Sequence, residues 1–214
     1  VQTCALPISN TGGMGAYSPA PLLTDDYLER IINEIIEPTI NELNKRNIDY
    51  RGVIYFGLMI TKSGPKVIEY NCRFGDPECQ TIMPLMDQNF VFLLEKCSMG
   101  NLAGDEIINT SDRVSACVVA TSKGYPYEYK TGFQIKIGKI DENDCQIFDS
   151  GTSISKNGKL LTDGGRVLSI VCQDKDFDIV FEKAYKNLKE IHFEGIYFRN
   201  DIGYQVRKNF SKEN

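Results

Sequence analysis

The most informative part of the sequence is Val67-Ile68-Glu69-Tyr70-Asn71-Cys72-Arg73-Phe74-Gly75-Asp76-Pro77-Glu78, which indicates how the first half of the chain folds. It begins inside one of two β-type runs, Val53–Thr61 and Lys66–Cys72. Runs rich in β-branched and aromatic residues are typical of strands, and the turn-forming residues 62–65 between them indicate a tight connection. We therefore predict an antiparallel hairpin that leads into a polar segment around Asp76.

Three polar residues, Glu69, Asn71 and Arg73, alternate along the second predicted strand. Alternate side chains share one face at intervals of about 6.6–7 Å, so these three are expected side by side. A carboxylate and an amide oxygen at this spacing suit Mg²⁺ (or Mn²⁺), which takes oxygen ligands and keeps phosphates in its shell. Arg73 would then neutralise charge on a transferring phosphoryl group. On spacing alone, a solvent-facing polar edge with a Glu–Arg pair explains the pattern equally well.

The segment Ser9–Leu23 is rich in Gly, Pro, Ser and Asn, which predicts a loop. At its centre lie Gly12, Gly13, Met14 and Gly15, whose backbone N–H groups can approach a phosphate or carboxylate closely. No Gly-Lys-Ser/Thr follows and no clear strand precedes, so this is not a Walker A loop or a dinucleotide fingerprint. A plain surface loop is the more common outcome for such a stretch.

The remaining pattern predicts an α+β chain in two parts, divided in the polar segment Gly100–Asp112. Apolar residues with a helical period follow Thr24, a good N-cap, and Pro38 within this helix should kink or divide it. Two more helices are expected over residues 88–98 and 177–191. Four short strands are expected over residues 114–121, 133–137, 146–149 and 166–171.

Composition excludes several classes of protein. The chain has 214 residues, which is long enough to bury a core without disulfide or metal staples. Its formal net charge is −5. The acidic balance argues against binding to nucleic acid or an anionic membrane, and no run approaches the roughly 20 apolar residues of a membrane span. A single histidine nearly excludes a histidine metal cluster or a serine triad. Seven cysteines, an odd number in a chain that is not small, indicate free thiols in a reducing compartment, here the cytoplasm. No C-x-x-C pair is present, so a zinc site has no support.

Several stretches together resemble one family, the phosphoribosylamine–glycine ligases (GAR synthetases) of the ATP-grasp superfamily. The run Glu69–Glu78 is the most specific of them, whereas Glu-x-Asn-x-Arg by itself is shared across the superfamily. The other similar stretches are Asn10–Pro19, Glu37–Thr39, Gly57–Met59, Gly124–Pro126, Asp163–Leu168, His192–Gly195 and Arg199–Gly203.

The resemblance implies an α+β fold in which the second lobe of an ATP-grasp domain, over residues 9–105, precedes a small β-rich C-terminal domain, over residues 106–214. It also implies a ligase of purine biosynthesis. Glycine is activated by ATP as glycyl phosphate, and the amine of 5-phosphoribosylamine displaces phosphate to give glycinamide ribonucleotide, ADP and phosphate.

Roles for single residues follow from the same resemblance. Glu69 and Asn71 match the family's magnesium ligands, and Arg73 matches a residue expected beside the transferring group. The loop Gly12–Gly15 matches a substrate-side loop that closes the active site.

Three further residues are candidates for substrate contact. Gly165 and Arg166 can hold a substrate phosphate through backbone N–H groups and the guanidinium, although the same residues also make an ordinary tight turn into a strand. Asp76 either orders the loop after the metal strand or contacts substrate, and the sequence does not separate these roles.

Two departures from the superfamily pattern bear on the interpretation. Gly57 stands twelve residues before Glu69, where many ATP-grasp enzymes carry a further metal-binding glutamate, and a glycine there favours the ligase family. The N-terminal domain and the lobe that covers adenine are expected before Asn10, so we expect a C-terminal half that needs the missing N-terminal half of its polypeptide for activity. The run Val1–Ile8 back-translates to a common sequencing adapter and is interpreted as a library artefact, with an apolar loop as the alternative.

Two other functions remain open at this point. One is a different ATP-grasp carboxylate–amine ligase or a carboxylase. The other is a non-catalytic module derived from the same fold.

Overall fold

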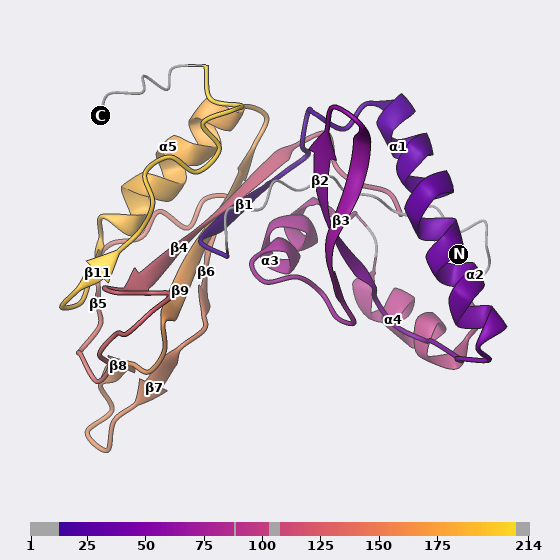
Figure 1. Cartoon of the computed structure of the whole chain (residues 1–214). Coiled ribbons are helices and arrows are strands. Elements are labelled where there is room, and N and C mark those ends of the chain that lie inside the picture. Colours follow the sequence, from indigo (N-terminus) through magenta and orange to yellow (C-terminus); the bar gives the residue numbers. More distant parts are fainter. Residues whose placement is uncertain (1–12, 88, 103–107, 209–214) are drawn as a thin grey trace. The chain divides into compact units, whose positions relative to one another are not determined.

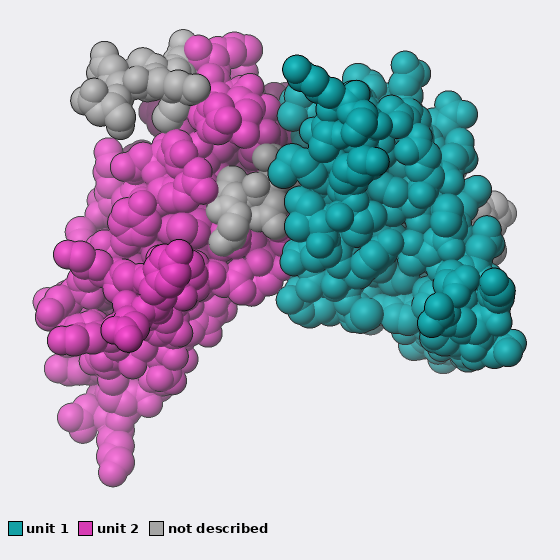
Figure 2. All heavy atoms as spheres, in the orientation of Figure 1, with its two compact units in different colours: residues 1–7, 20–75, 86–111 teal, residues 8–19, 76–85, 112–214 magenta. Residues whose placement is uncertain are grey.

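A computed structural model describes residues 13–87, 89–102 and 108–208 (Figure 1). The chain forms two compact units, coloured separately in Figure 2. Within the described ranges, unit 1 takes residues 20–75 and 86–111, and unit 2 takes residues 13–19, 76–85 and 112–208. The predicted division between residues 105 and 106 assigns one continuous segment to each domain. The two compact units instead each combine segments that are separated in the sequence. No helix among the described residues is long and apolar enough to cross a membrane.

Unit 1 begins with a helical segment in three parts: α1 (Asp25–Ile31), the π-helical η1 (Ile32–Ile36) and α2 (Glu37–Lys45). Thr24 is the N-cap, as predicted, and its side chain accepts a hydrogen bond from the amide of Tyr27. Pro38 lies in the first turn of α2. Proline has no N–H and crowds the carbonyl four residues earlier. The wider π turn immediately before Pro38, closed by Glu37 N–H donating to the Ile32 carbonyl, accommodates it, so the segment is interrupted at η1 instead of ending.

The predicted hairpin is confirmed: β2 (Tyr55–Thr61) pairs antiparallel with β3 (Gly64–Asn71). The helix predicted over residues 88–98 is α4 (Phe90–Met99). The side chain of Asn89 caps α4 by accepting from the amide of Phe92, and Gly100 ends it in the left-handed conformation that glycine adopts without strain.

Unit 2 is built on an antiparallel five-stranded sheet with the order β1-β4-β9-β6, in which β11 pairs with a further part of β4. Helix α5 (Phe177–Leu188) packs against β4 and β9 and buries Phe181 and Leu188 (Figure 1). The sheet strands are β1 (Gly15–Ser18), β4 (Val114–Ser122), β6 (Cys145–Asp149), β9 (Arg166–Asp174) and β11 (Ile196–Tyr197). The smaller elements are α3 (Glu78–Ile82), η2 (Met83–Leu85), β5 (Lys136–Ile137), β7 (Thr152–Ile154), β8 (Leu160–Thr162) and β10 (Ile191–His192).

Two sequence predictions are wrong in this unit. The loop expected over residues 9–23 contains strand β1, whose residues are all buried. Four residues between glycines and a proline carry no readable period, and only their pairing with β4 makes them a strand. All cysteines were expected to be free thiols, but Cys145 and Cys172 form a disulfide. The pairing of β6 with β9 places these two residues directly opposite each other, with 4.1 Å between their Cα atoms.

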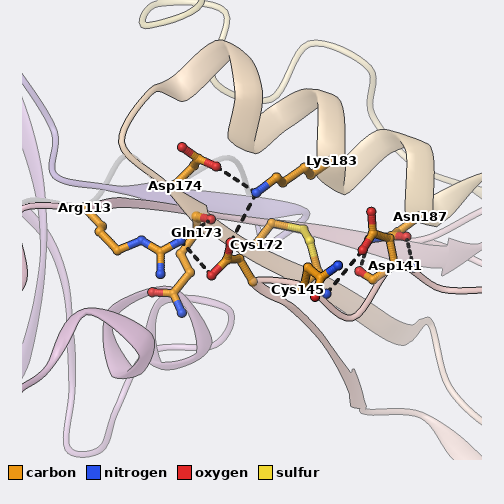
Figure 3. The surroundings of a disulfide bond; sticks show 10 residues. Arg113, Asp141, Cys145, Cys172, Gln173, Asp174, Lys183 and Asn187 are labelled. Atoms are coloured by element: carbon orange, nitrogen blue, oxygen red, sulfur yellow. Dashed lines mark hydrogen bonds and ion pairs between the residues drawn. A yellow bond between two sulfur atoms is a disulfide. The ribbon is translucent and has the colours of Figure 1, made fainter.

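A charged cluster lies beside this disulfide (Figure 3). Lys183 of α5 contacts Asp174 at 2.7 Å and Asp144 at 3.4 Å, and Arg113 contacts Asp144 at 2.8 Å. Hydrogen bonds from these cations hold the pKa of both carboxyl groups below the ordinary range. The cluster thus ties the turn before β6 and the end of β9 to the helix.

We predict that Lys183→Met lowers the free energy of unfolding at pH 7 by about 0.5–1 kcal/mol, because it removes two partly exposed ion pairs. Carboxyl groups with a lowered pKa stabilise the fold above their unfolded pKa of about 4, and this contribution disappears as the pH falls through the folded pKa. Urea unfolding at pH 7 and at about pH 2 should therefore show the difference only at pH 7. Lys186→Met, an exposed position on the same helix, is the control. An equal loss at both values of pH would contradict the prediction.

Candidate functional site

The predicted metal ligands lie together on β3 in unit 1. The side-chain amide of Asn71 donates a hydrogen bond to Oε1 of Glu69 at 3.2 Å, so the two side chains share a face, as strand alternation requires. The side chain of Glu69 is exposed and that of Asn71 is half-buried. A carboxylate and an amide are therefore in contact on an open surface, where both can offer oxygen to a hard cation.

Gly57 provides the space in which Glu69 lies. The two residues are directly opposite each other in the hairpin. A Cβ atom at Gly57 would approach Cγ of Glu69 to 2.7 Å, so the stem of Glu69 fills the position of the missing side chain. The stem of Glu69 thus occupies space that the side chain of any larger residue at position 57 would fill.

The opposite face of β3 holds the strand against the helices. The Tyr70 ring packs edge-on against Phe56 with 5.3 Å between ring centroids. The Tyr70 hydroxyl lies 3.1 Å from the hydroxyl of Thr39 in α2. These contacts fix which face of β3 turns toward the helix, and consequently leave Glu69 and Asn71 on the other face.

Arg73 does not continue this face. Strand β3 ends at Asn71, and Arg73 lies in a bend in which its guanidinium donates to the carbonyl of Phe74 at 2.8 Å. The expectation that alternation aligns Arg73 with Glu69 and Asn71 is therefore wrong, since alternation holds only within the strand. The Arg73 side chain is exposed and attached to a bend instead of a rigid strand.

A second group of predicted residues comes together in unit 2. The guanidinium of Arg166 donates to the Asp76 carbonyl at 2.6 Å and to the Asp76 carboxylate at 2.9 Å. A Cβ atom at Gly13 would lie 3.4 Å from Nη1 of Arg166 and 3.7 Å from the Tyr125 hydroxyl. Candidates from three separated stretches of the sequence thus belong to one end of the sheet: Gly13, Asp76, and the neighbours Gly165 and Arg166.

The turn Gly164-Gly165 is held by Ser122 at the end of β4. The Ser122 amide donates to the Gly165 carbonyl and its hydroxyl donates to the Gly164 carbonyl. Gly165 is buried under two tyrosine rings, because a Cβ atom there would come within 2.5 Å of Tyr125 and 2.9 Å of Tyr129. Ser122 and Tyr125 were missed as site residues by sequence reasoning; the Gly-Tyr-Pro motif that contains Tyr125 was the available signal.

The remaining glycine-rich residues are placed differently. Met14 is buried, and its carbonyl accepts from the amide of Val119 in β4. Gly15 lies inside β1, where a Cβ atom would come within 2.8 Å of the Cys117 carbonyl. Gly12 is outside the described residues. Among the described residues 13–15, Gly13 is consequently the one that lies beside Arg166.

A hollow of about 410 Å³ lies next to this cluster and shares Tyr129 with it. Its volume is in the range of small-molecule sites. Its lining carries both signs of charge and consists of Lys123, Glu128, Tyr129, Lys130, Phe133, Glu194 and Gly195. Within β4, burial raises the pKa of the Cys117 thiol to about 12, so this residue is not a nucleophile at neutral pH.

Comparison with known proteins gives two matching domains of one family. The description "Phosphoribosylglycinamide synthetase, ATP-grasp (A) domain" matches residues 8–79, and "Phosphoribosylglycinamide synthetase, C domain" matches residues 115–205. The first match contains Glu69 and Asn71, and the second contains Gly165 and Arg166. Both groups of candidate residues therefore lie within the matched regions.

Curated relatives include a ligase and a larger trifunctional protein, both named for purine-related enzymes. A phosphoribosylamine–glycine ligase of Synechocystis sp. is 42% identical over 199 residues, which are 92% of this chain and 47% of the relative. A trifunctional purine biosynthetic protein of Gallus gallus is 42% identical over 198 residues, 92% of this chain and 20% of the relative. The chain thus spans about half the length of the ligase and a fifth of the trifunctional protein.

Solved structures agree on the fold. The crystal structure of a phosphoribosylamine–glycine ligase from Thermotoga maritima has a TM-score of 0.76 and 33% identity, and the match covers 90% of this chain and 47% of that one. Biotin carboxylase from Campylobacter jejuni, at 17% identity, has a TM-score of 0.61 with 92% of this chain and 45% of that one covered, and supports the fold alone. The predicted α+β, ATP-grasp-type fold is confirmed.

We predict that Gly165→Ala lowers the free energy of unfolding by about 1–3 kcal/mol, because the added methyl group must displace Tyr125 and Tyr129 from a packed turn. The matched control is Gly52→Ala, where the methyl group would meet the Tyr50 side chain at ordinary contact distances of 3.5 Å and more. Chemical denaturation of both variants measures the difference. Equal stability of the two would show that the rings do not rest on Gly165.

Proposed function

Since the chain belongs to the phosphoribosylglycinamide synthetase family, we propose that it supplies about half of a phosphoribosylamine–glycine ligase. In the proposed reaction the carboxylate of glycine attacks the γ-phosphate of ATP, which gives glycyl phosphate and ADP. The amine of 5-phosphoribosylamine then attacks the acyl carbon, loses a proton and displaces phosphate, which gives glycinamide ribonucleotide. The domain assignment proposed with it is an ATP-grasp lobe over residues 9–105 and a C-terminal domain over residues 106–214.

The observation that carries this proposal is the contact between Glu69 and Asn71 on an open strand face. We assign to this pair a divalent cation, Mg²⁺ or Mn²⁺, because Glu69 offers a carboxylate, Asn71 carries an amide oxygen and Gly57 leaves room for the carboxylate. Since Nδ2 of Asn71 donates to Glu69 in the structure, the amide would have to turn Oδ1 toward such a cation. When bound, such a cation would neutralise phosphate charge during transfer. Glu69 and Asn71 would hold that cation, and Tyr70 anchors their strand from its other face through its contact with Thr39.

Arg73 is proposed to act on the transferring group from the bend after the strand. Its guanidinium is exposed and donates to the carbonyl of the next residue, Phe74. Exchanging that neutral acceptor for an anionic acyl phosphate gives a stronger, charge-assisted hydrogen bond. Placed beside the leaving phosphate, the positive charge of Arg73 would stabilise the charge that develops as the amine attacks.

The cluster in unit 2 is proposed to receive the phosphate of 5-phosphoribosylamine. Arg166 supplies a guanidinium, and the backbone of Gly13 lies beside it, since a Cβ atom at Gly13 would lie 3.4 Å from Nη1 of Arg166. In the free chain the Asp76 carboxylate occupies one edge of that guanidinium, so an incoming phosphate must share Arg166 or displace Asp76. Gly12 stays a predicted substrate contact, whereas Met14 and Gly15 would support the loop from within the core.

The whole enzyme is proposed to work in the cytoplasm. The thiols of Cys72, Cys79, Cys97 and Cys117 are free, which is typical of proteins in a reducing compartment, although Cys145 and Cys172 are bridged.

We predict that this chain alone releases no ADP in the presence of glycine and 5-phosphoribosylamine, and that joining the N-terminal half of the Thermotoga maritima ligase ahead of it restores ADP release. Release should require both glycine and the amine. Glu69→Gln in the chimera should lower kcat at least about 100-fold with an unchanged melting temperature, because the carboxylate charge is lost without loss of volume. A chimera that folds and hydrolyses ATP without either substrate would point to a different ATP-grasp reaction, and a folded chimera without any turnover would favour a non-catalytic module.

We predict that Asp76→Asn tightens the binding of inorganic phosphate to this chain several-fold, because the competing carboxylate charge on Arg166 is removed. Arg166→Gln should weaken binding about tenfold or more. Titration followed by ³¹P NMR measures both. Weaker phosphate binding in Asp76→Asn would assign Asp76 to the binding site itself instead of to a competitor.

A further inference from the structure

We propose that Gly57 is a positioning residue: by having no side chain opposite Glu69, it makes that carboxylate lie across β2 beside Asn71. The inference rests on the proposed metal role of Glu69 and Asn71, and adds how the pair is oriented. It also gives a reason for a glycine at position 57, where a carboxylate residue opposite Glu69 would be a second possible metal ligand.

The steric argument starts from three distances. A Cβ atom built at Gly57 lies 2.7 Å from Cγ, 3.5 Å from Cδ and 3.4 Å from Oε1 of Glu69. Contacts under 3.0 Å are essentially never made by real Cβ atoms. Cγ is the second carbon of the side chain, so it cannot yield by a movement of the free carboxylate end. A side chain at position 57 therefore requires Glu69 to leave its χ1 rotamer, which carries the carboxylate away from Asn71.

Backbone conformation does not explain the glycine. Gly57 is absent from the residues with positive φ, unlike Gly64 at the turn of the same hairpin. Glycine within a strand is also less stable than alanine by about 0.5–1 kcal/mol. What remains is the space that Gly57 leaves open, and the stem of Glu69 fills that space.

An irregularity of the hairpin lies at the same point. The register pairs Gly57 with Glu69 but Leu58 with Val67, so Ile68 is an extra residue in β3. Such a bulge twists the strand and changes the direction of neighbouring side chains. The bulge and the glycine thus act on adjacent residues, Ile68 and Glu69, and both determine where the carboxylate points.

One chemical consequence follows for the donor set. A carboxylate introduced at position 57 would compete with Glu69 for the same space, so β2 cannot add a second carboxylate without displacing the first. Position 57 therefore adds no second carboxylate to the pair of Glu69 and Asn71, and a cation held by this pair would complete its shell with other ligands, such as water and the phosphates of its substrate.

The test uses the whole 214-residue chain and the variants Gly57→Ala, Gly52→Ala and Glu69→Ala. The first readout, without metal, is the side-chain amide resonance of Asn71, which reports its hydrogen bond to Glu69. The second is the Mn²⁺ concentration that half-broadens this resonance. The third is the melting temperature.

We expect Gly57→Ala to shift the Asn71 resonance as Glu69→Ala does and to raise the required Mn²⁺ concentration about tenfold or more, as for other residues that orient metal ligands. The melting temperature should not fall, and Gly52→Ala should match the unsubstituted chain throughout. A Gly57→Ala variant with an unchanged Asn71 resonance would overturn the proposal.

Two further outcomes are informative. If Mn²⁺ does not broaden the resonance in the unsubstituted chain, the metal assignment fails, while the metal-free shift still decides whether Gly57 positions Glu69. If Gly57→Ala does not fold, the double variant Gly57→Ala/Glu69→Ala, which lacks the clashing Cγ, should restore folding. Failure to restore it would overturn the steric argument.

Discussion

The antiparallel pairing of β4 with β9 is the interaction on which the rest of unit 2 depends. Both strands are almost entirely buried, and β1, β11 and β6 complete the sheet by pairing with them. Because the strands are antiparallel, the end of β4 meets the beginning of β9, where Thr121 is paired with Arg166. The strand ends thereby bring Ser122 to the Gly164-Gly165 turn and Arg166 to Asp76. The position of Ser122, Gly165 and Arg166 relative to one another is consequently set by the register of the sheet.

Both candidate groups lie beside a break in strand register. In unit 1 the break falls between Gly57 and Leu58, next to Glu69. In unit 2 it falls between Ala120 and Thr121, next to Arg166. A regular ladder alternates side chains strictly, and an extra residue releases one of them from that alternation. The two charged side chains with the main proposed roles are thus placed where the hairpin and the sheet depart from regularity.

The difference between what was and was not predictable from the sequence follows the range of the interactions. Thr24, Pro38 and the hairpin are local features, and the helices and strands around them lie close to their predicted positions. Strand β1 was missed because its only strand-like property is a partner about a hundred residues away. Arg73 was assigned to a strand face that ends two residues earlier, which shows that a short motif with period two does not reveal where its strand stops. The bond between Cys145 and Cys172 needs the register of β6 against β9, and no spacing of cysteines encodes that register.

The family and the proximity of Glu69 to Asn71 could be inferred from the amino-acid sequence without a structure. Residues two apart on a strand share a face whatever surrounds them. It also identified Gly13, Asp76, Gly165 and Arg166 as separate candidates. The folded chain was needed to show that these four belong to one cluster, that Arg166 donates to Asp76, and that the stem of Glu69 lies over Gly57. The physical reason is that cross-strand contacts depend on register, and register is set by the packing of whole strands, which leaves no trace in the spacing of the residues that it brings together.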